Sequence, residues 1–434
     1  MKYAFLLGRN KLLSIAELRA TLARDGIQYQ HTDSSPLRLA DNFYVIETKE
    51  NIVAPQTFLD RLGGTIKIIE LFDSLQSHKL AEIPSLMTAL LSPHTQAPAT
   101  QKKFLLGVSF YGEKFSARDV RRFGMECKKY IASSLAGRSV RFVHAQQSLA
   151  LDAASIRKNN ILERGADMCV IEHQDHQLIG RTIAVQNIDF YSARDYGRPW
   201  RDMNIGMMPP KLCQIIINLA GVPQGGAVLD PYCGLGTILQ EGMLLGLDMY
   251  GSDIDARIVE HARENLRWIQ SNLSPRTRAH AGTCDDNHLL QSNVRDIASR
   301  FSGKKFDAIV TESDLGPIFS RLPHNTEIDQ LSASIERTSH VAFQQYTSLL
   351  QPGGKVVTAF PYYQPREKKL GPITVISDEF LDILEKLGYD RLSYISPDEI
   401  PDMFLRAHIT RRKSLLYGRP NQIVGREIFV FQKH

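Results

Sequence analysis

A pair of glycines follows a short apolar stretch in the second half of the chain. The segment DPYCGLGT, residues 230–237, contains Gly234 and Gly236 and comes directly after GGAVLD. Because glycine has no Cβ, the backbone there can turn tightly and approach a ligand closely. A glycine pair alone suits any nucleotide, or only a tight turn. The dinucleotide pattern GxGxxG and the P-loop pattern GxxxxGK[ST] are both absent, so neither a dinucleotide nor ATP is predicted.

Acidic residues end three successive predicted strands in this half of the chain. Asp230 opens the glycine loop, Asp253 lies 23 residues later at the end of MYGSD, and Asp285 or Asp286 follows the next strand. Asp253 is placed to accept hydrogen bonds from a ribose diol, and the third acid is placed to reach an adenine amino group. Each acid alone is commonly a helix N-cap, but three at successive strand ends predict a nucleoside-bearing cofactor. The predicted cofactor contacts are Asp230, Tyr232, Gly234, Gly236, Thr237, Asp253, Ile254 and Asp285.

A concentration of positive charge lies in the first half of the chain. Residues 101–150 contain ten Lys and Arg against three Asp and Glu, although the whole chain carries a net charge of only +5. Five of these ten cations lie in a predicted helix over residues 116–135 and fall largely on one face of it, while the other face is apolar. A charge run is usually a solvated surface, but a positive helix face also suits a phosphate backbone. The candidate RNA contacts are Lys114, Arg118, Arg121, Arg122, Lys128 and Lys129, with Arg198 added from a later Arg-rich segment. For Arg198, the alternative is that it only holds the two halves of the chain together.

Composition excludes several other classes of protein. The five cysteines lie far apart, with no CxxC pair and no neighbouring histidines, so neither a zinc site nor a disulfide framework is predicted. No metal site is expected. No apolar run approaches the length that spans a membrane, and the opening residues do not have the pattern of a secretory signal. A cytoplasmic protein without membrane contact fits these features best.

The predicted elements place the glycine loop and the acids at one edge of a sheet. From residue 211 onward, short apolar strands alternate with helices, as in a parallel sheet covered on both faces. Before that point, strands and helices mix in an α+β pattern, with strands at 104–110, 140–143 and 168–171 and a helix over 151–165. The segment YSARDYGRPWRDMNIGMMPP, residues 191–210, is rich in Gly, Pro and Arg and is predicted to be a linker. The fold class is therefore α/β in the second half and α+β in the first.

Several long motifs resemble one known family. The segments RDYGRPWRDMNIGMMPPKLCQIIINLAG (194–221) and YGRPNQIVGREIFVF (417–431) resemble the THUMP-domain tRNA guanosine N2-methyltransferases that modify position 10. LDAASIRKNNILERGAD (151–167) and IGRTIAVQNIDFYSARD (179–195) resemble the end of a THUMP domain. The glycine loop and GSDID (251–255) resemble the class I, Rossmann-like methyltransferase fold, which implies S-adenosyl-L-methionine as cofactor. The resemblance covers most of the chain and thins over 1–100 and 290–400.

The resemblance implies a domain order and a partner. A ferredoxin-like domain is expected at 1–75, a THUMP-like RNA-binding domain at 76–188, a linker at 189–210 and the Rossmann-like catalytic domain at 211–434. tRNA is the expected partner. A small activating protein subunit stays an open alternative, and the sequence leaves the oligomeric state open.

The family's catalytic motif is altered in this chain. The resemblance implies a pocket built by an Asp-Pro-Pro-Tyr motif after the fourth strand of the catalytic domain, which places a carboxylate and an aromatic ring against a flipped-out base. Here the matching segment reads Glu312, Ser313, Asp314 and Leu315. Glu312 is the candidate catalytic carboxylate, with Asp314 as a substitute if the loop is shifted. Leu315 cannot stack, so Phe319, Tyr362 or Tyr363 is expected to supply the ring.

Three functions remain open on the sequence. The first is methylation of the exocyclic N2 of a guanosine in tRNA, with position 10 favoured. The second is methylation of an amino group at another RNA position or on adenine, which the altered motif makes more credible. The third is a catalytically silent tRNA-binding protein, which would bind RNA with a steep salt dependence but would not bind S-adenosylmethionine.

Overall fold

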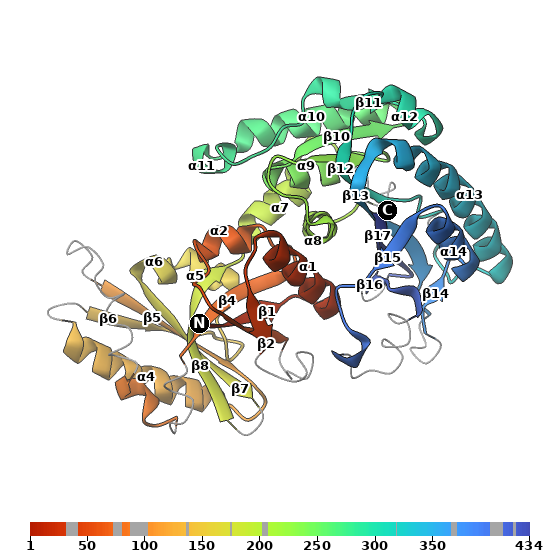
Figure 1. Cartoon of the computed structure of the whole chain (residues 1–434). Coiled ribbons are helices and arrows are strands. Elements are labelled where there is room, and N and C mark those ends of the chain that lie inside the picture. Colours follow the sequence, from red (N-terminus) through yellow and green to blue (C-terminus); the bar gives the residue numbers. More distant parts are fainter. Residues whose placement is uncertain are drawn as a thin grey trace. The chain divides into compact units, whose positions relative to one another are not determined.

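The computed structural model describes residues 1–31, 42–72, 80–86, 103–135, 139–173, 176–201, 207–317, 319–365, 371–399, 411–419 and 422–434. The chain forms two compact units, each built on one sheet (Figure 1). The first unit comprises Met1–Gly8, Ile27–Asp60 and Thr65–Phe190. The second unit comprises Arg9–Gly26, Arg61–Gly64 and Tyr191–His434. Among the described residues, no helix is both long and apolar enough to cross a bilayer.

The first unit contains a single eight-stranded sheet. Strand β4 pairs antiparallel with β8, from Lys67 opposite Val185 to Leu71 opposite Gly180. This pairing joins strands from the two regions that were expected to be separate domains, 1–75 and 76–188, because hydrogen bonds between neighbouring edges merge them into one sheet. In sheet order the strands are β2 (Tyr29–His31), β3 (Phe43–Thr48), β1 (Lys2–Leu7), β4 (Thr65–Leu71), β8 (His176–Val185), β7 (Gly165–His173), β5 (Lys103–Tyr111) and β6 (Ser139–Val143).

The helices of the first unit are α2 (Pro55–Asp60), α4 (Ala117–Ser134), α5 (Ala153–Lys158) and α6 (Ile161–Arg164). The predicted basic helix is α4, which begins after a capping box formed by Ser116 and Asp119. The single helix expected over 151–165 is two short helices instead. Asn160, between them, has a φ of 51°, and this left-handed conformation interrupts the helical backbone.

The second unit contains a nine-stranded, mostly parallel sheet. Strands β11, β10, β9, β12 and β13 are parallel, and β17 lies antiparallel between β13 and β15. The chain runs outward from β9 to β11 and then returns to β12 on the other side of β9. The topological switch point therefore lies between β9 and β12, and ligands of such sheets bind outside the carboxyl ends of the strands there. The bounds are β9 (Ala227–Asp230), β10 (Asp248–Asp253), β11 (Leu289–Gln291), β12 (Phe306–Glu312), β13 (Leu350–Tyr363), β14 (Ile373–Thr374), β15 (Tyr389–Leu392), β16 (Leu415–Tyr417) and β17 (Val424–Lys433).

Helices cover this second sheet, and one of them was not expected. The longest helix, α13 (Asn325–Leu349), lies in a polar stretch for which the sequence patterns predicted no helix. It buries Phe343 and Tyr346 in the core of the unit. The other helices are α7 (Ile188–Tyr196), α8 (Pro210–Ala220), α9 (Thr237–Leu244), α10 (Ala256–Asn272), α11 (Pro275–Arg278), α12 (Ile297–Arg300) and α14 (Asp378–Lys386), with 3₁₀ turns at Asp286–His288, Val294–Asp296 and Pro397–Glu399.

The segment expected to be a linker is partly helical and belongs to the second unit. Residues 188–196 form α7, in which Arg194 makes a buried ion pair with Glu241 of α9, with a Nε–Oε1 distance of 2.6 Å. Further along, Asn265 of α10 accepts from the backbone N–H of Trp200 and donates to its carbonyl. These bonds fix the segment from Arg194 to Trp200 onto the second unit, so it does not act as a loose tether.

An N-terminal helix also belongs to the second unit. Helix α1 (Lys11–Arg24) was expected in an N-terminal domain, but its Glu17 side chain is buried against α8. The Glu17 carboxylate accepts hydrogen bonds of 2.8 Å from the backbone N–H groups of Gly63 and Gly64 and from the Asn218 side chain. Since these bonds satisfy a buried carboxylate, they anchor α1 to the rest of the second unit.

Candidate active site

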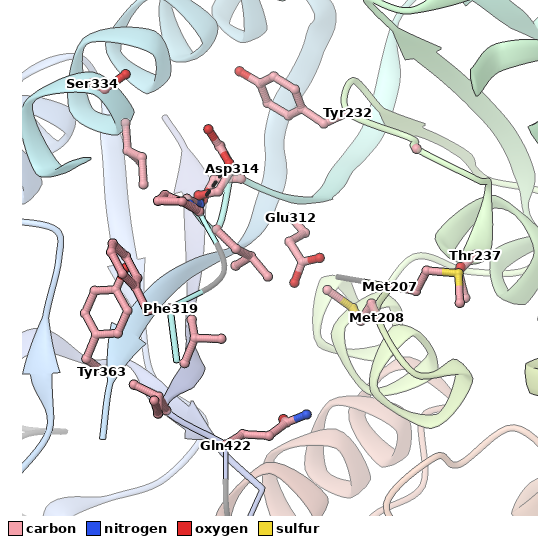
Figure 2. Close-up of a pocket in the computed structure, with 18 of the residues that line it drawn as sticks. Met207, Met208, Tyr232, Thr237, Glu312, Asp314, Phe319, Ser334, Tyr363 and Gln422 are labelled. Carbon is pink, nitrogen blue, oxygen red and sulfur yellow. Dashed lines mark hydrogen bonds between the residues drawn. The ribbon is translucent and has the colours of Figure 1, made fainter. Parts of the chain in front are cut away.

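A large cavity lies at the carboxyl ends of β9 and β12, where the topology predicts a ligand. Its volume is about 1220 Å³. Figure 2 shows Thr237 and Met207 on one side of the cavity, Phe319 and Tyr363 on the other, and Glu312 between them. The predicted site residues that line it are Asp230, Tyr232, Gly234, Thr237, Asp253, Glu312 and Asp314. Gly236, Ile254 and Asp285 are not among the lining residues.

The glycine loop has the backbone conformation that the sequence predicts. Gly234 and Gly236 have φ angles of 49° and 80°, in the left-handed region that favours glycine. Helix α9 begins at Thr237, directly after Gly236. The loop therefore brings backbone to the wall of the cavity without a Cβ at either glycine.

Asp230 lies beneath the loop and is almost fully buried. Its Oδ1 accepts hydrogen bonds from the Thr311 hydroxyl at 2.6 Å and from the backbone N–H of Tyr232 at 3.2 Å. Burial raises the pKa of Asp230 to about 7, and these two hydrogen bonds oppose the shift. Asp230 thus links β9 to the neighbouring strand β12 and shapes the start of the loop.

Asp253 ends β10 and faces the same loop. Its Oδ2 accepts from the backbone N–H of Gly234 at 3.1 Å, and its Oδ1 accepts from that of Asp255 at 3.1 Å. This arrangement keeps a carboxylate on the cavity wall beside the glycines. By contrast, the Ile254 side chain is 65% exposed, and Asp285 stands at the N-terminus of a 3₁₀ turn outside the cavity.

Glu312, at the end of β12, is paired with a residue that the sequence did not single out. Arg426 of β17 donates through its Nε to Glu312 Oε1, and both side chains are largely buried. Desolvation raises the pKa of Glu312, while the Arg426 charge and hydrogen bond lower it. The strand register explains why these two side chains are in contact. On the two sides of β13, Glu312 pairs with Ala359 and Arg426 pairs with Pro361. Because Ala359 and Pro361 are two residues apart, their side chains lie on the same face of the sheet.

The loop after Glu312 is held by hydrogen bonds in place of the two prolines of the family motif. The Ser313 N–H and hydroxyl both donate to the Ala359 carbonyl, at 3.0 and 3.1 Å. Asp314 Oδ1 accepts from the Gly316 N–H at 2.9 Å. Gly316 has a φ of 76°, and a Cβ there would lie 2.7 Å from the Leu331 side chain. The altered loop is thus locally well tied, and it keeps both Glu312 and Asp314 at the cavity.

Aromatic rings are present on the wall opposite the glycine loop. Phe319 and Tyr363 line the cavity with ring centroids 5.9 Å apart and planes at 76°. Leu315 also lines it, whereas Tyr362, the third predicted ring, does not. Of the three rings predicted to hold a flipped-out base, Phe319 and Tyr363 therefore reach the cavity.

The predicted RNA contacts divide into exposed and buried residues. On α4, Arg118, Arg121, Arg122 and Lys129 are exposed and Lys128 is half-buried, on the face away from the buried Val120 and Phe123. Lys114 is exposed and pairs with Glu172 at 2.8 Å. Arg198 is different, because only 3% of it is exposed and its Nη1 donates to the Thr237 hydroxyl at 2.7 Å. A side chain this buried does not offer its guanidinium to a phosphate backbone, so the predicted RNA contact of Arg198 is corrected.

Comparison with known families decides the kind of domain. Residues 198–360 match the family model described as RMKL-like, methyltransferase domain. These residues include the glycine loop, Asp253 and Glu312. This part of the chain is similar to RMKL-like methyltransferase domains. The methyl donor is S-adenosylmethionine, and the site fits it, because the two glycines leave room for a ligand and Asp253 offers a ribose acceptor.

Curated relatives match parts of the chain. The tRNA (guanine(10)-N2)-dimethyltransferase of Methanothermobacter thermautotrophicus is 34% identical over 190 residues, which are 44% of this chain and 48% of the relative. A protein of Methanothermococcus thermolithotrophicus, named probable tRNA (guanine(10)-N2)-dimethyltransferase, is 42% identical over 108 residues, 24% of this chain and 60% of the relative. The chain thus spans about half the length of the first of these relatives.

Solved structures of low sequence identity also resemble the chain. TrmN from Thermus thermophilus is 13% identical, with a TM-score of 0.48 and full coverage of both chains. A possible methylase from Clostridium difficile 630 is 12% identical, with a TM-score of 0.45 and coverage of 100% and 97%.

Proposed function

We propose that the protein is an S-adenosylmethionine-dependent tRNA methyltransferase that acts on the exocyclic N2 of a guanosine, with position 10 favoured. The observation that carries the proposal is that one cavity holds both parts of such a reaction. The glycine loop with Asp253 lies on one side of it, the aromatic rings on the other, and the Glu312 carboxylate lies between them (Figure 2).

The chemistry of an amino group explains why Glu312 matters. The lone pair of an exocyclic nitrogen is delocalised into the base, so the nitrogen is a poor nucleophile. A carboxylate and a backbone carbonyl that accept its two hydrogens aim the lone pair at the donor methyl group, and the gain comes from positioning and electrostatics. Glu312 would be the carboxylate, kept ionised by Arg426. Phe319 or Tyr363 would hold the base in the pocket.

The first unit would supply the grip on tRNA. The exposed cations of α4 form a positive surface that suits phosphates. The segment 76–188, which contains α4, is the proposed THUMP-like region, within the shared sheet described above. Two relatives carry names that state a tRNA substrate. We also propose a cytoplasmic location, because all five cysteines are buried and form no disulfide.

A second candidate function follows from the altered motif. Where the family has a carboxylate, two prolines and an aromatic residue, this chain has Glu312, Ser313, Asp314 and Leu315, and Leu315 stands at the cavity wall. This difference favours an amino-methyltransferase for another RNA base, such as adenine, over the silent RNA-binding protein. A silent protein has no need of the intact glycine loop.

The test is methyl transfer from labelled S-adenosylmethionine to bulk tRNA, followed by nucleoside digestion and mass spectrometry. Labelled N2-methylguanosine that is lost in Glu312→Gln and kept in Glu379→Gln, an exposed control in the same unit, supports the proposal. Label on a different nucleoside favours the second candidate. Absence of label, with tRNA bound but no cofactor bound, favours the silent protein. If both bind without transfer, adding cell extract tests for an activating subunit.

A further inference from the structure

The guanidinium of Arg198 is buried beside the glycine loop without an anion. Among the described residues, no carboxylate lies within 4.0 Å of it. Its Nη1 donates to the Thr237 hydroxyl at 2.7 Å and its Nη2 lies 3.1 Å from the Met207 sulfur, and both of these residues line the cavity. Its Nε is buried and makes no hydrogen bond within the described part of the chain. Because a buried cation without a counter-charge is costly, an anion at this place would stabilise the site.

The start of α9 also favours an anion at the same place. Thr237, which accepts from Arg198, is the first residue of α9. The N-cap residue is Gly236, so no side chain caps the first-turn N–H groups. These N–H groups and the helix dipole make the N-terminus of a helix favourable for negative charge. The buried guanidinium is a second, independent feature that points to the same ligand charge.

Two negatively charged side chains line the cavity near the loop. Asp230 and Asp253 line the cavity here, and they suit hydroxyl groups and an ammonium group. They would repel a carboxylate. Of the described residues that line the cavity, Arg419 is the one Lys or Arg. No hydrogen bond is found between Arg419 and the glycine loop among the described residues, whereas Arg198 donates to Thr237 at the end of that loop. The cofactor carries a carboxylate on its methionine part, so Arg198 is the cation best placed for it.

We propose that the N-terminus of α9, backed by the buried charge of Arg198, binds the carboxylate of the methionine part of S-adenosylmethionine. Arg198 is not itself a lining residue, and it would act from behind Thr237, which lines the cavity and accepts its hydrogen bond. The inference rests on one part of the proposed function, the use of S-adenosylmethionine as cofactor. It does not depend on which RNA is the substrate. It assigns to Arg198 a role in cofactor binding in place of the RNA contact that its surrounding Arg-rich segment indicated.

Binding to the unmodified full-length protein tests the proposal first. Isothermal titration would compare S-adenosylhomocysteine with its carboxamide, in which the carboxylate is replaced by a neutral group of the same shape. The carboxamide is expected to bind about tenfold more weakly or worse, as for the loss of a charge-assisted hydrogen bond. Equal affinities would overturn the proposal. If neither compound binds, the proposed function itself fails, and this inference fails with it.

A variant then identifies Arg198 as the cation. In Arg198→Gln, the affinity for S-adenosylhomocysteine should fall to that for the carboxamide, while the affinity for the carboxamide should stay unchanged. Arg198→Lys should recover part of the difference. As a control, Asp253→Ala should weaken both compounds by the same factor, because both carry the ribose. If Arg198→Gln also weakens both compounds equally, Arg198 only supports the loop and the proposal is wrong.

Discussion

The buried pair of Glu312 and Arg426 makes a prediction about pH. Removing the guanidinium with Arg426→Met leaves Glu312 desolvated, so its pKa should rise further and the acid limb of the pH–rate profile should move to higher pH. The other titratable groups that interact with Glu312 are Asp230 and Cys213, and neither carries a positive charge. We expect kcat near neutral pH to fall by roughly one to two orders of magnitude, with a smaller change in KM.

The measurement is kcat and KM for methyl transfer between pH 5.5 and 9. Arg426→Lys is the conservative control and should return the acid limb toward its original position. A uniform loss of rate at every pH would contradict the assignment, because it would indicate general disruption of β17 and no effect on the ionisation of Glu312.

Asp253 makes a second prediction at this scale. Its carboxylate holds the Gly234 N–H and faces the cavity, so Asp253→Ala should weaken binding of S-adenosylhomocysteine by about 10- to 100-fold. Asp255→Ala is a matched control two residues away, because Asp255 caps the start of α10 and does not line the cavity. Titration calorimetry gives both values. An equal loss in the two variants would show that only the local turn matters.

At the scale of elements, α4 predicts how the protein binds tRNA. Replacing Arg118 and Arg121 by Gln removes two exposed charges from one face of the helix without touching its buried face. We expect weaker tRNA binding and a shallower dependence of log Kd on log salt, by about one to two in slope, because fewer counterions are released. Filter binding between 50 and 300 mM salt measures both quantities.

The control for α4 removes the same charge from the second unit. Arg295 and Lys305 are exposed there, so their double replacement by Gln changes the net charge equally. If both double variants change the slope by the same amount, the binding depends on overall charge and α4 has no special role.

The elements also show where sequence patterns succeed. The short apolar strands β9 and β10 were predicted because each is a brief apolar run with a clear end. The first ends in Asp230 before the glycine turn, and the second ends in Asp253. Helix α13 was not predicted, although Ile328, Leu331 and Ile335 recur at helical spacing within an otherwise polar stretch. Its position depends on packing against the core of the second unit, which no local pattern encodes.

Across the whole molecule, the residues that meet are often far apart in the chain. Glu17 and Asn218 are separated by 201 positions, and Glu312 and Arg426 by 114. The sequence analysis named Glu312 from its motif, but its partner depends on the register of β13 and β17. For the same reason, the sequence patterns placed α1 and the segment 189–210 outside the C-terminal domain. In the structure, α1 and the described residues from Tyr191 onward belong to the second unit.

Glu17 gives a prediction about the stability of the second unit. Burial raises the pKa of Glu17 from 4.5 to about 7, so the folded state binds its proton more tightly than the unfolded state does. Its contribution to stability is therefore complete below about pH 4.5 and is lost as the pH rises through 7. We expect the wild-type protein to lose stability between pH 5 and 8 relative to Glu17→Gln, by at most about 3 kcal/mol.

Urea unfolding at several pH values, followed by tryptophan fluorescence, measures this difference. Both tryptophans, Trp200 and Trp268, belong to the second unit, so the signal reports on that unit. Glu379→Gln controls for the loss of an exposed carboxylate of α14. A difference between wild type and Glu17→Gln that stays constant with pH would contradict the raised pKa.

The place of β17 has a consequence for biosynthesis. This strand lies inside the sheet, between β13 and β15, and it carries Arg426, yet it follows every other described strand along the chain. A ribosome therefore makes it after all of them, and until then β13 and β15 lack their common neighbour. A nascent or prematurely terminated chain that contains the glycine loop and Glu312 still lacks the cation that completes the site. Such fragments would accordingly modify no RNA, even when they reach the cofactor.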